Sequence, residues 1–143
     1  MKIMVSLDGS ESSMRALDFI TSRPWAEDDQ FMIVSVVEPD KGDMSMAQAM
    51  TNPDEVFFAN AEKLLANVKD KFDVSLNGHA VSTAVLSGPV VESLVDCAKE
   101  YSADLIVMGS EGRKGVSRLL LGSVAEGVLR SAPCSVQIVR RKL

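Results

Sequence analysis

The chain contains one histidine and two cysteines, and it has no phosphate loop of the G-x4-GK[ST] type. The missing loop argues against an ATPase of the P-loop class. The single histidine, His79, is far in sequence from the glycine-rich segments described below, so we interpret it as structural or exposed. No serine or cysteine has a histidine near it in a recognisable triad context. The sequence therefore gives little support to an enzyme.

The two cysteines, Cys97 and Cys134, stand alone in apolar surroundings. Because they lack the spacing of a CxxC or metal site, we predict buried, reduced thiols and no metal centre. Residues 1–5 run directly into a strand pattern without the layout of a signal peptide. No apolar run approaches the length of a membrane span. We therefore expect a cytoplasmic protein that does not engage a membrane.

Basic residues are in the minority: 15 Lys and Arg face 20 Asp and Glu, which gives a net charge of −5. This balance argues against a surface for nucleic acid or anionic lipid. An anionic ligand would need a local site. The 143 residues suit one domain, 1–143, with no repeat, low-complexity tract or linker, and the 46% of apolar residues can fill a core.

Strand and helix patterns alternate along the chain. Five strands are predicted at residues 2–7, 31–37, 79–86, 104–108 and 134–139. Helices are predicted after Ser10 or Ser12, from about Pro53, from Gly88-Pro89, and over residues 123–131. The first, second and fourth strands are apolar on both faces, which is typical of a parallel sheet covered by helices on each side. The predicted fold is one doubly wound α/β domain.

A glycine-punctuated segment follows the fourth predicted strand. It reads Gly109-Ser110-Glu111-Gly112, then nine residues, then Gly122-Ser123 at the start of a helix. Glycines let a backbone approach an anion closely, and the free N–H groups of a first helical turn then point at it. The pattern indicates a phosphate site. The alternative is an ordinary strand-to-helix turn, with residues 123–126 forming a capping box.

A second conspicuous turn, Asp8-Gly9-Ser10, follows the first predicted strand. Doubly wound sheets bind ligands beyond the carboxyl ends of their strands, at the point where the strand order reverses. If the first and fourth strands are neighbours, this acidic turn and the glycine segment face one crevice. That juxtaposition favours the phosphate interpretation.

These features together resemble the universal stress protein family over essentially the whole chain. The resemblance rests on Val5-Ser6-Leu7-Asp8-Gly9-Ser10, Ser35-Val36-Val37-Glu38-Pro39, Gly88-Pro89, Ile106-Val107-Met108-Gly109-Ser110, residues 115–123 and Ala132-Pro133-Cys134-Ser135-Val136. The spacing G-x2-G-x9-G-[ST] is intact and marks the family's ATP-binding branch.

The resemblance implies a flavodoxin-like, Rossmann-like sheet in the order 3-2-1-4-5 that binds ATP. It implies that Asp8 lies near the ribose and that the main chain of Val36 contacts adenine. The phosphates and ribose would lie against Met108, Gly109, Gly112, Gly122, Ser123 and Val124. Arg113 either steadies the triphosphate or is solvated, and Asp8 could instead bond only the backbone of its own turn.

Glu111 departs from the commoner family pattern, in which a basic or polar residue, often histidine, occupies this position. A carboxylate there repels phosphates unless it points outward or meets a metal. Asp8 and Glu111 could hold Mg²⁺ through the phosphates, since hard oxygen ligands suit this ion. The loop at residues 44–50, with three methionines, has no assigned role.

Three functions follow as hypotheses: an ATP-binding regulatory module of the stress response, a slow ATPase or nucleotidyl-transfer enzyme, and a nucleotide-free interaction protein. The resemblance also implies a homodimer formed through the strand at residues 134–139, because an exposed edge strand invites pairing. The alternative is that Arg140, Arg141 and Lys142 protect a solvated edge.

Overall fold

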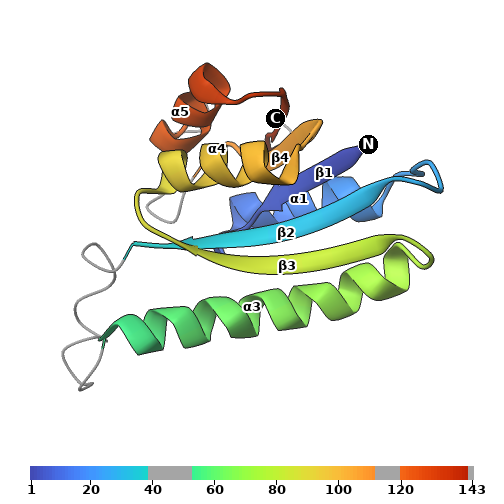
Figure 1. Cartoon of the computed structure of the whole chain (residues 1–143), viewed down its shortest axis with the longest axis horizontal. Helices are drawn as coiled ribbons and strands as arrows, with labels where there is room; N and C mark the ends of the chain where they lie inside the picture. The colour runs from blue at the N-terminus through green and yellow to red at the C-terminus, as the bar shows by residue number, and fades with distance from the viewer. Residues whose placement is uncertain (39–52, 112–119, 142–143) are drawn as a thin grey trace.

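Five parallel strands form the centre of the protein in a computed structural model, which describes residues 1–38, 53–111 and 120–141 (Figure 1). The sheet has the order β3-β2-β1-β4-β5, as predicted. The strands are β1 (Lys2–Ser6), β2 (Gln30–Val37), β3 (Ala80–Ser87), β4 (Leu105–Gly109) and β5 (Ser135–Val139). The described helices are α1 (Glu11–Thr21), α3 (Pro53–Ser75), α4 (Val90–Tyr101) and α5 (Ser123–Ser131).

Alternation along the strands sends side chains to two separate cores. Ile3 and Val5 of β1 pack with Leu17 of α1 and Phe72 of α3 on one face of the sheet. Met4, between them in sequence, packs with α4 and α5 on the other face. Successive strand residues point to opposite faces, so a strand covered on both sides must be apolar throughout. This explains why the central strands read as continuous apolar runs.

The strand order reverses between β1 and β4. The chain passes from β1 to β2 and β3 on one side, then crosses to β4 and β5 on the other. Ile3 pairs with Leu105, and Val5 pairs with Val107. The first and fourth strands are therefore neighbours, as the crevice hypothesis requires, and their carboxyl ends lie at one edge of the sheet.

Helix starts differ slightly from the sequence predictions. Ser10, not Ser12, caps α1, because its side chain accepts the Ser13 N–H at 3.1 Å. Pro89 is the N-cap of α4 and not its first helical residue. The N–H of the next residue, Val90, is bound by the Glu38 carboxylate at 2.9 Å. That contact spans 52 residues, so local patterns could not predict it.

His79 and the two cysteines lie among residues of the folded core and its turns, and their contacts are as follows. His79 Nε2 lies 2.9 Å from the Ala26 carbonyl oxygen, and the ring packs edge-on against Phe31. Cys97 and Cys134 are free thiols, as predicted, but they are half-buried and not fully buried. Burial raises the pKa of each thiol, so both favour the protonated form.

Among the described residues, no helix is both long and apolar enough to cross a membrane.

Candidate functional site

The turn after β1 places a carboxylate at the carboxyl edge of the sheet. The Leu7 N–H donates to the Val34 carbonyl at 2.9 Å, so sheet bonding continues one residue beyond β1. Asp8 Oδ1 then accepts the Ser10 N–H at 2.9 Å. Gly9, at φ +84°, takes the left-handed conformation that glycine favours. Asp8 therefore does bond the backbone of its own turn, but a carboxylate has further acceptor sites for a ligand.

The end of β4 lies directly against the first turn of α1. A Cβ atom on Gly109 would be 2.5 Å from the Ser12 carbonyl oxygen and 2.6 Å from its carbonyl carbon. The next residue, Ser110, is buried, and the Glu111 N–H donates to Ser12 Oγ at 3.0 Å. Glycine at position 109 thus permits a close approach between two segments far apart in sequence, and the contact fixes where the glycine-rich segment begins.

The glycine-rich segment ends at the N-terminus of α5, and this end is tied back to β4. The Gly122 N–H donates to the Ser110 carbonyl at 2.7 Å. Gly122 is the N-cap, and among the described residues no side chain caps the helix. Glu126 pairs with Arg130 at 2.8 Å. The alternative interpretation as a capping box at residues 123–126 is therefore wrong, because Gly122 and not Ser123 is the N-cap. Ser123 is exposed in the first turn of the helix.

Those predicted adenine and phosphate residues that the structure describes lie at this same edge. Val34 pairs with Ser6, so Val36 and Asp8, two residues further along, come to the same level. Val36 and Val124 are half-buried, whereas Met108 is buried against the α4 and α5 layer. Gly112 and Arg113 lie outside the described residues, as do Lys114, Arg118 and the loop at residues 44–50.

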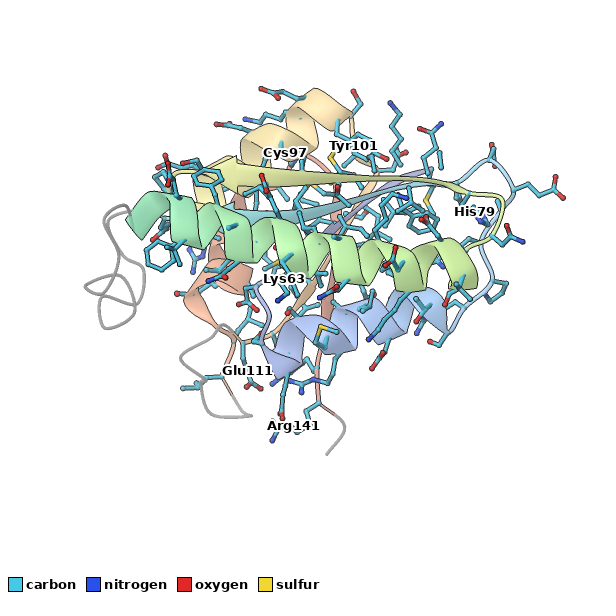
Figure 2. All side chains as sticks on the ribbon, turned by 90° about the horizontal axis from the view of Figure 1, so that it is seen from below. Lys63, His79, Cys97, Tyr101, Glu111 and Arg141 are labelled. Carbon is cyan, nitrogen blue, oxygen red and sulfur yellow. The ribbon has the colours of Figure 1, made fainter. Side chains whose placement is uncertain are left out.

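Glu111 has a partner that the sequence analysis did not identify. Arg15 Nη2 lies 3.7 Å from Glu111 Oε1, and the side chains are 23% and 13% exposed, respectively. Figure 2 shows Glu111 beside one end of α1, at the opposite end of the molecule from His79. Ser12 and Arg15 are three residues apart on one helix and so share a face. The three-residue spacing of Ser12 and Arg15 was the only sequence feature that could have suggested this contact. It became interpretable only when the structure showed that β4 packs against this face of α1.

The described residues contain no group of three or more His, Cys, Asp and Glu side chains that could hold a metal ion. The described part of this edge offers backbone N–H donors, the N-terminus of α5 and the Asp8 carboxylate. Such a set of groups can bind an anion that also carries hydroxyl groups.

Comparison with known proteins gives one consistent result. The family model described as the universal stress protein family matches residues 1–140. The universal stress protein MJ0531 of Methanocaldococcus jannaschii is 30% identical to this chain over 147 aligned residues, covering 98% of this chain and 82% of that protein.

Solved structures agree with the sequence comparison. The structure of protein MJ0577, also from Methanocaldococcus jannaschii, superposes with a TM-score of 0.85 at 25% identity, covering 99% of this chain and 96% of that one. A universal stress protein in complex with cAMP superposes with a TM-score of 0.71 at 26% identity, covering 98% and 96% of the two chains.

Proposed function

Because this chain belongs to the universal stress protein family, we propose that it is an ATP-binding regulatory protein of the stress response. The nucleotide lies between the Asp8 turn and residues 109–123. One observation carries the proposal: the Asp8 turn, the Gly109 approach and the start of α5 converge where the strand order reverses between β1 and β4. This is the position at which doubly wound sheets bind ligands.

The phosphates are bound at the N-terminus of α5. Ser123, directly after the N-cap Gly122, presents its N–H group and its hydroxyl there, and the helix dipole adds about 0.3–1 kcal/mol for a negative charge. The whole chain carries a net charge of −5, so attraction must come from this local set of donors. The proposed phosphate and ribose contacts also include Met108, Gly109, Gly112, Arg113 and Val124.

The nucleoside is bound at the ends of β1 and β2. A carboxylate can accept several hydrogen bonds, so the Asp8 carboxylate, which accepts the Ser10 N–H, can also accept one from a ribose hydroxyl. The main chain near Val36, level with Asp8, contacts the adenine edge. The related protein in complex with cAMP, 26% identical to this chain, supports an adenine nucleotide as the ligand class.

Mg²⁺ accompanies the triphosphate and is bound mainly through its phosphates. Of the two predicted carboxylates, Glu111 is paired with Arg15, and we propose Asp8 as the carboxylate that contacts the ion. Mg²⁺ is commonly bound through one or two carboxylates plus substrate phosphates, with water completing its octahedron. The proposed protein contribution to the ion is thus a single contact from Asp8.

Nucleotide binding regulates and does not drive catalysis in this proposal. The only histidine is bound to the Ala26 carbonyl near the amino end of β3, where it cannot serve as a base for a ligand at the carboxyl edge. The free thiols of Cys97 and Cys134 agree with a reducing, cytoplasmic compartment.

A homodimer forms through β5, which is the last strand of the sheet on one side. Its outer edge can pair with the same strand of a second copy across a two-fold axis. The strand is short, and its five residues alternate between exposed and half-buried positions up to Ile138. The dimer would contain two ATP sites, one in each chain. Bound nucleotide could then regulate the binding of partners to the assembly.

Substituting valine for glycine at the start of α5 tests the nucleotide site. Gly122 has φ −63° and ψ 155°, a conformation open to any residue, so Gly122→Val imposes no backbone strain, and its side chain blocks the approach of a phosphate. Ser131→Val, at the exposed far end of the same helix, is the matched control. ATP binding is lost in the first variant and kept in the second. Equal affinity in both folded variants would overturn the site assignment.

A further inference from the structure

The contact between Arg15 and Glu111 joins α1 to the residue that opens the glycine-rich segment. The two charged groups are 3.7 Å apart, and both side chains are largely shielded from solvent. Glu111 is also tied to α1 through its N–H, which donates to Ser12 Oγ at 3.0 Å. Main chain and side chain of one residue therefore meet the same face of one helix, at positions three residues apart.

The geometry of this pair is poor for a contact that only stabilises the fold. A strong Arg–carboxylate pair is bidentate, with N–O distances of about 2.7–2.9 Å. Here the contact is 3.7 Å long, and the Nε and Nη2 atoms of Arg15 are buried with no hydrogen-bond partner among the described residues. Buried donors without partners are costly, and a buried ion pair is weak evidence for stability. Fold stability therefore does not account for the guanidinium at this position, and we look for a role in ligand binding.

The charge of Glu111 near the start of α5 suggests such a role for Arg15. Glu111 directly follows Ser110, whose carbonyl is bonded to the α5 N-cap. A carboxylate at this point repels an anion bound beside the helix start, and shielding from solvent lengthens the reach of that repulsion. Arg15 supplies the opposite charge at ion-pair distance. The pair together is neutral, so it presents little net field to phosphates at the same edge of the sheet.

We propose that Arg15 is a positioning residue that neutralises Glu111 and holds it on α1, so that this carboxylate does not oppose a polyphosphate at the carboxyl edge of β4. The inference rests on the proposed nucleotide site and extends it: the pair sets how strongly affinity depends on the number of phosphates. Removing the cation exposes the Glu111 charge, whose effect grows with ligand charge. Removing the carboxylate instead leaves the Arg15 charge, which favours the ligand.

Affinities for adenosine, AMP and ATP, measured by calorimetry at low salt, test the proposal. Arg15→Gln weakens ATP binding about tenfold, weakens AMP binding less, and leaves adenosine binding unchanged. Glu111→Gln acts oppositely and tightens ATP binding severalfold. Arg130→Gln, which breaks an exposed pair on α5, is the matched control and leaves the ATP-to-adenosine ratio unchanged.

The double variant Arg15→Gln, Glu111→Gln separates charge compensation from a merely structural role. It restores ATP affinity to within about threefold of the wild type, since neither charge remains. Equal losses for adenosine and ATP in Arg15→Gln, or no recovery in the double variant, overturn the inference while leaving the nucleotide site in place. Failure of the wild-type protein to bind any of the three ligands overturns the proposed function and this inference together. Should Arg15→Gln fail to fold, the opposite shift in Glu111→Gln still decides the matter.

Discussion

Gly109 at the end of β4 and Ser12 in the first turn of α1 are so close that a single added carbon at residue 109 would be 2.5 Å from the Ser12 carbonyl oxygen. The two residues are 97 positions apart in sequence, yet their contact determines where the glycine-rich segment leaves the sheet. Ser12 Oγ then accepts the Glu111 N–H. The start of the proposed phosphate site is therefore built by packing between α1 and β4, as much as by the glycine spacing.

Gly109→Ala should destabilise the fold by about 1–3 kcal/mol, because the new methyl group meets backbone atoms, which cannot rotate away. Urea unfolding monitored by circular dichroism measures the effect. Gly78→Ala is an informative control: Gly78 has open space around it but a φ of +92°, so its cost is backbone strain of about 1 kcal/mol. Wild-type stability in Gly109→Ala would show that α1 and β4 are not packed as described.

Gln137→Asp should dissociate the proposed homodimer. Gln137 is exposed at the centre of the five-residue strand β5, so in an antiparallel pair across a two-fold axis it faces its own copy. Two carboxylates placed opposite each other repel. Sedimentation velocity at micromolar concentration should give a two-chain mass for the wild type and a one-chain mass for the variant.

Thr83→Asp serves as the control for this experiment, since Thr83 is exposed on β3, the strand at the other edge of the sheet. This variant should remain dimeric. A one-chain mass for the wild-type protein, or dissociation by Thr83→Asp alone, would contradict pairing through β5.

Asp29 should make stability depend on pH in the acid range. Its buried carboxylate binds the Met1 ammonium at 2.7 Å and the Ala26 N–H at 2.9 Å. The hydrogen bond to the ammonium is the main cause that lowers the Asp29 pKa below its ordinary value of 3.8. A lowered folded-state pKa means that this stabilisation is complete above pH 3.8 and is lost as pH falls through the folded value.

The variant Asp29→Asn isolates that contribution. It should cost on the order of 1 kcal/mol at pH 6, and the difference from the wild type should shrink as the pH is lowered from 3.8 toward 2. Asp28→Asn, an exposed neighbour, should show a much smaller difference. Chemical unfolding across this range provides the measurement, and a difference that grows toward low pH would reverse the assigned sign.

Much of the fold follows from local patterns in the sequence. Continuous apolar runs such as Ile3 to Val5 and Ile106 to Met108 predict strands buried on both faces, and the structure places their side chains in two cores. Strand bounds differ from prediction by one residue at several ends, where caps and final ladder bonds decide the limits. The strand order rested on the family resemblance and is confirmed.

The site was less accessible to prediction, because its contacts join distant residues. The glycine spacing indicated the segment, and Asp8 was recognisable as the turn after a central strand. Arg15 was not, since a lone arginine on an amphipathic helix is ordinarily a solvated residue. Its partner, Glu111, is 96 residues away, and only the packing of β4 against α1 brings the two together.

The central claim is tested most directly by calorimetric titration of the purified wild-type protein with ATP, with and without Mg²⁺. A denatured sample is first checked for co-purified nucleotide. The account predicts saturable binding near or below the micromolar range, or nucleotide carried from the cell. A folded protein that carries no nucleotide and gives no heat with millimolar ATP, with or without the ion, would contradict it.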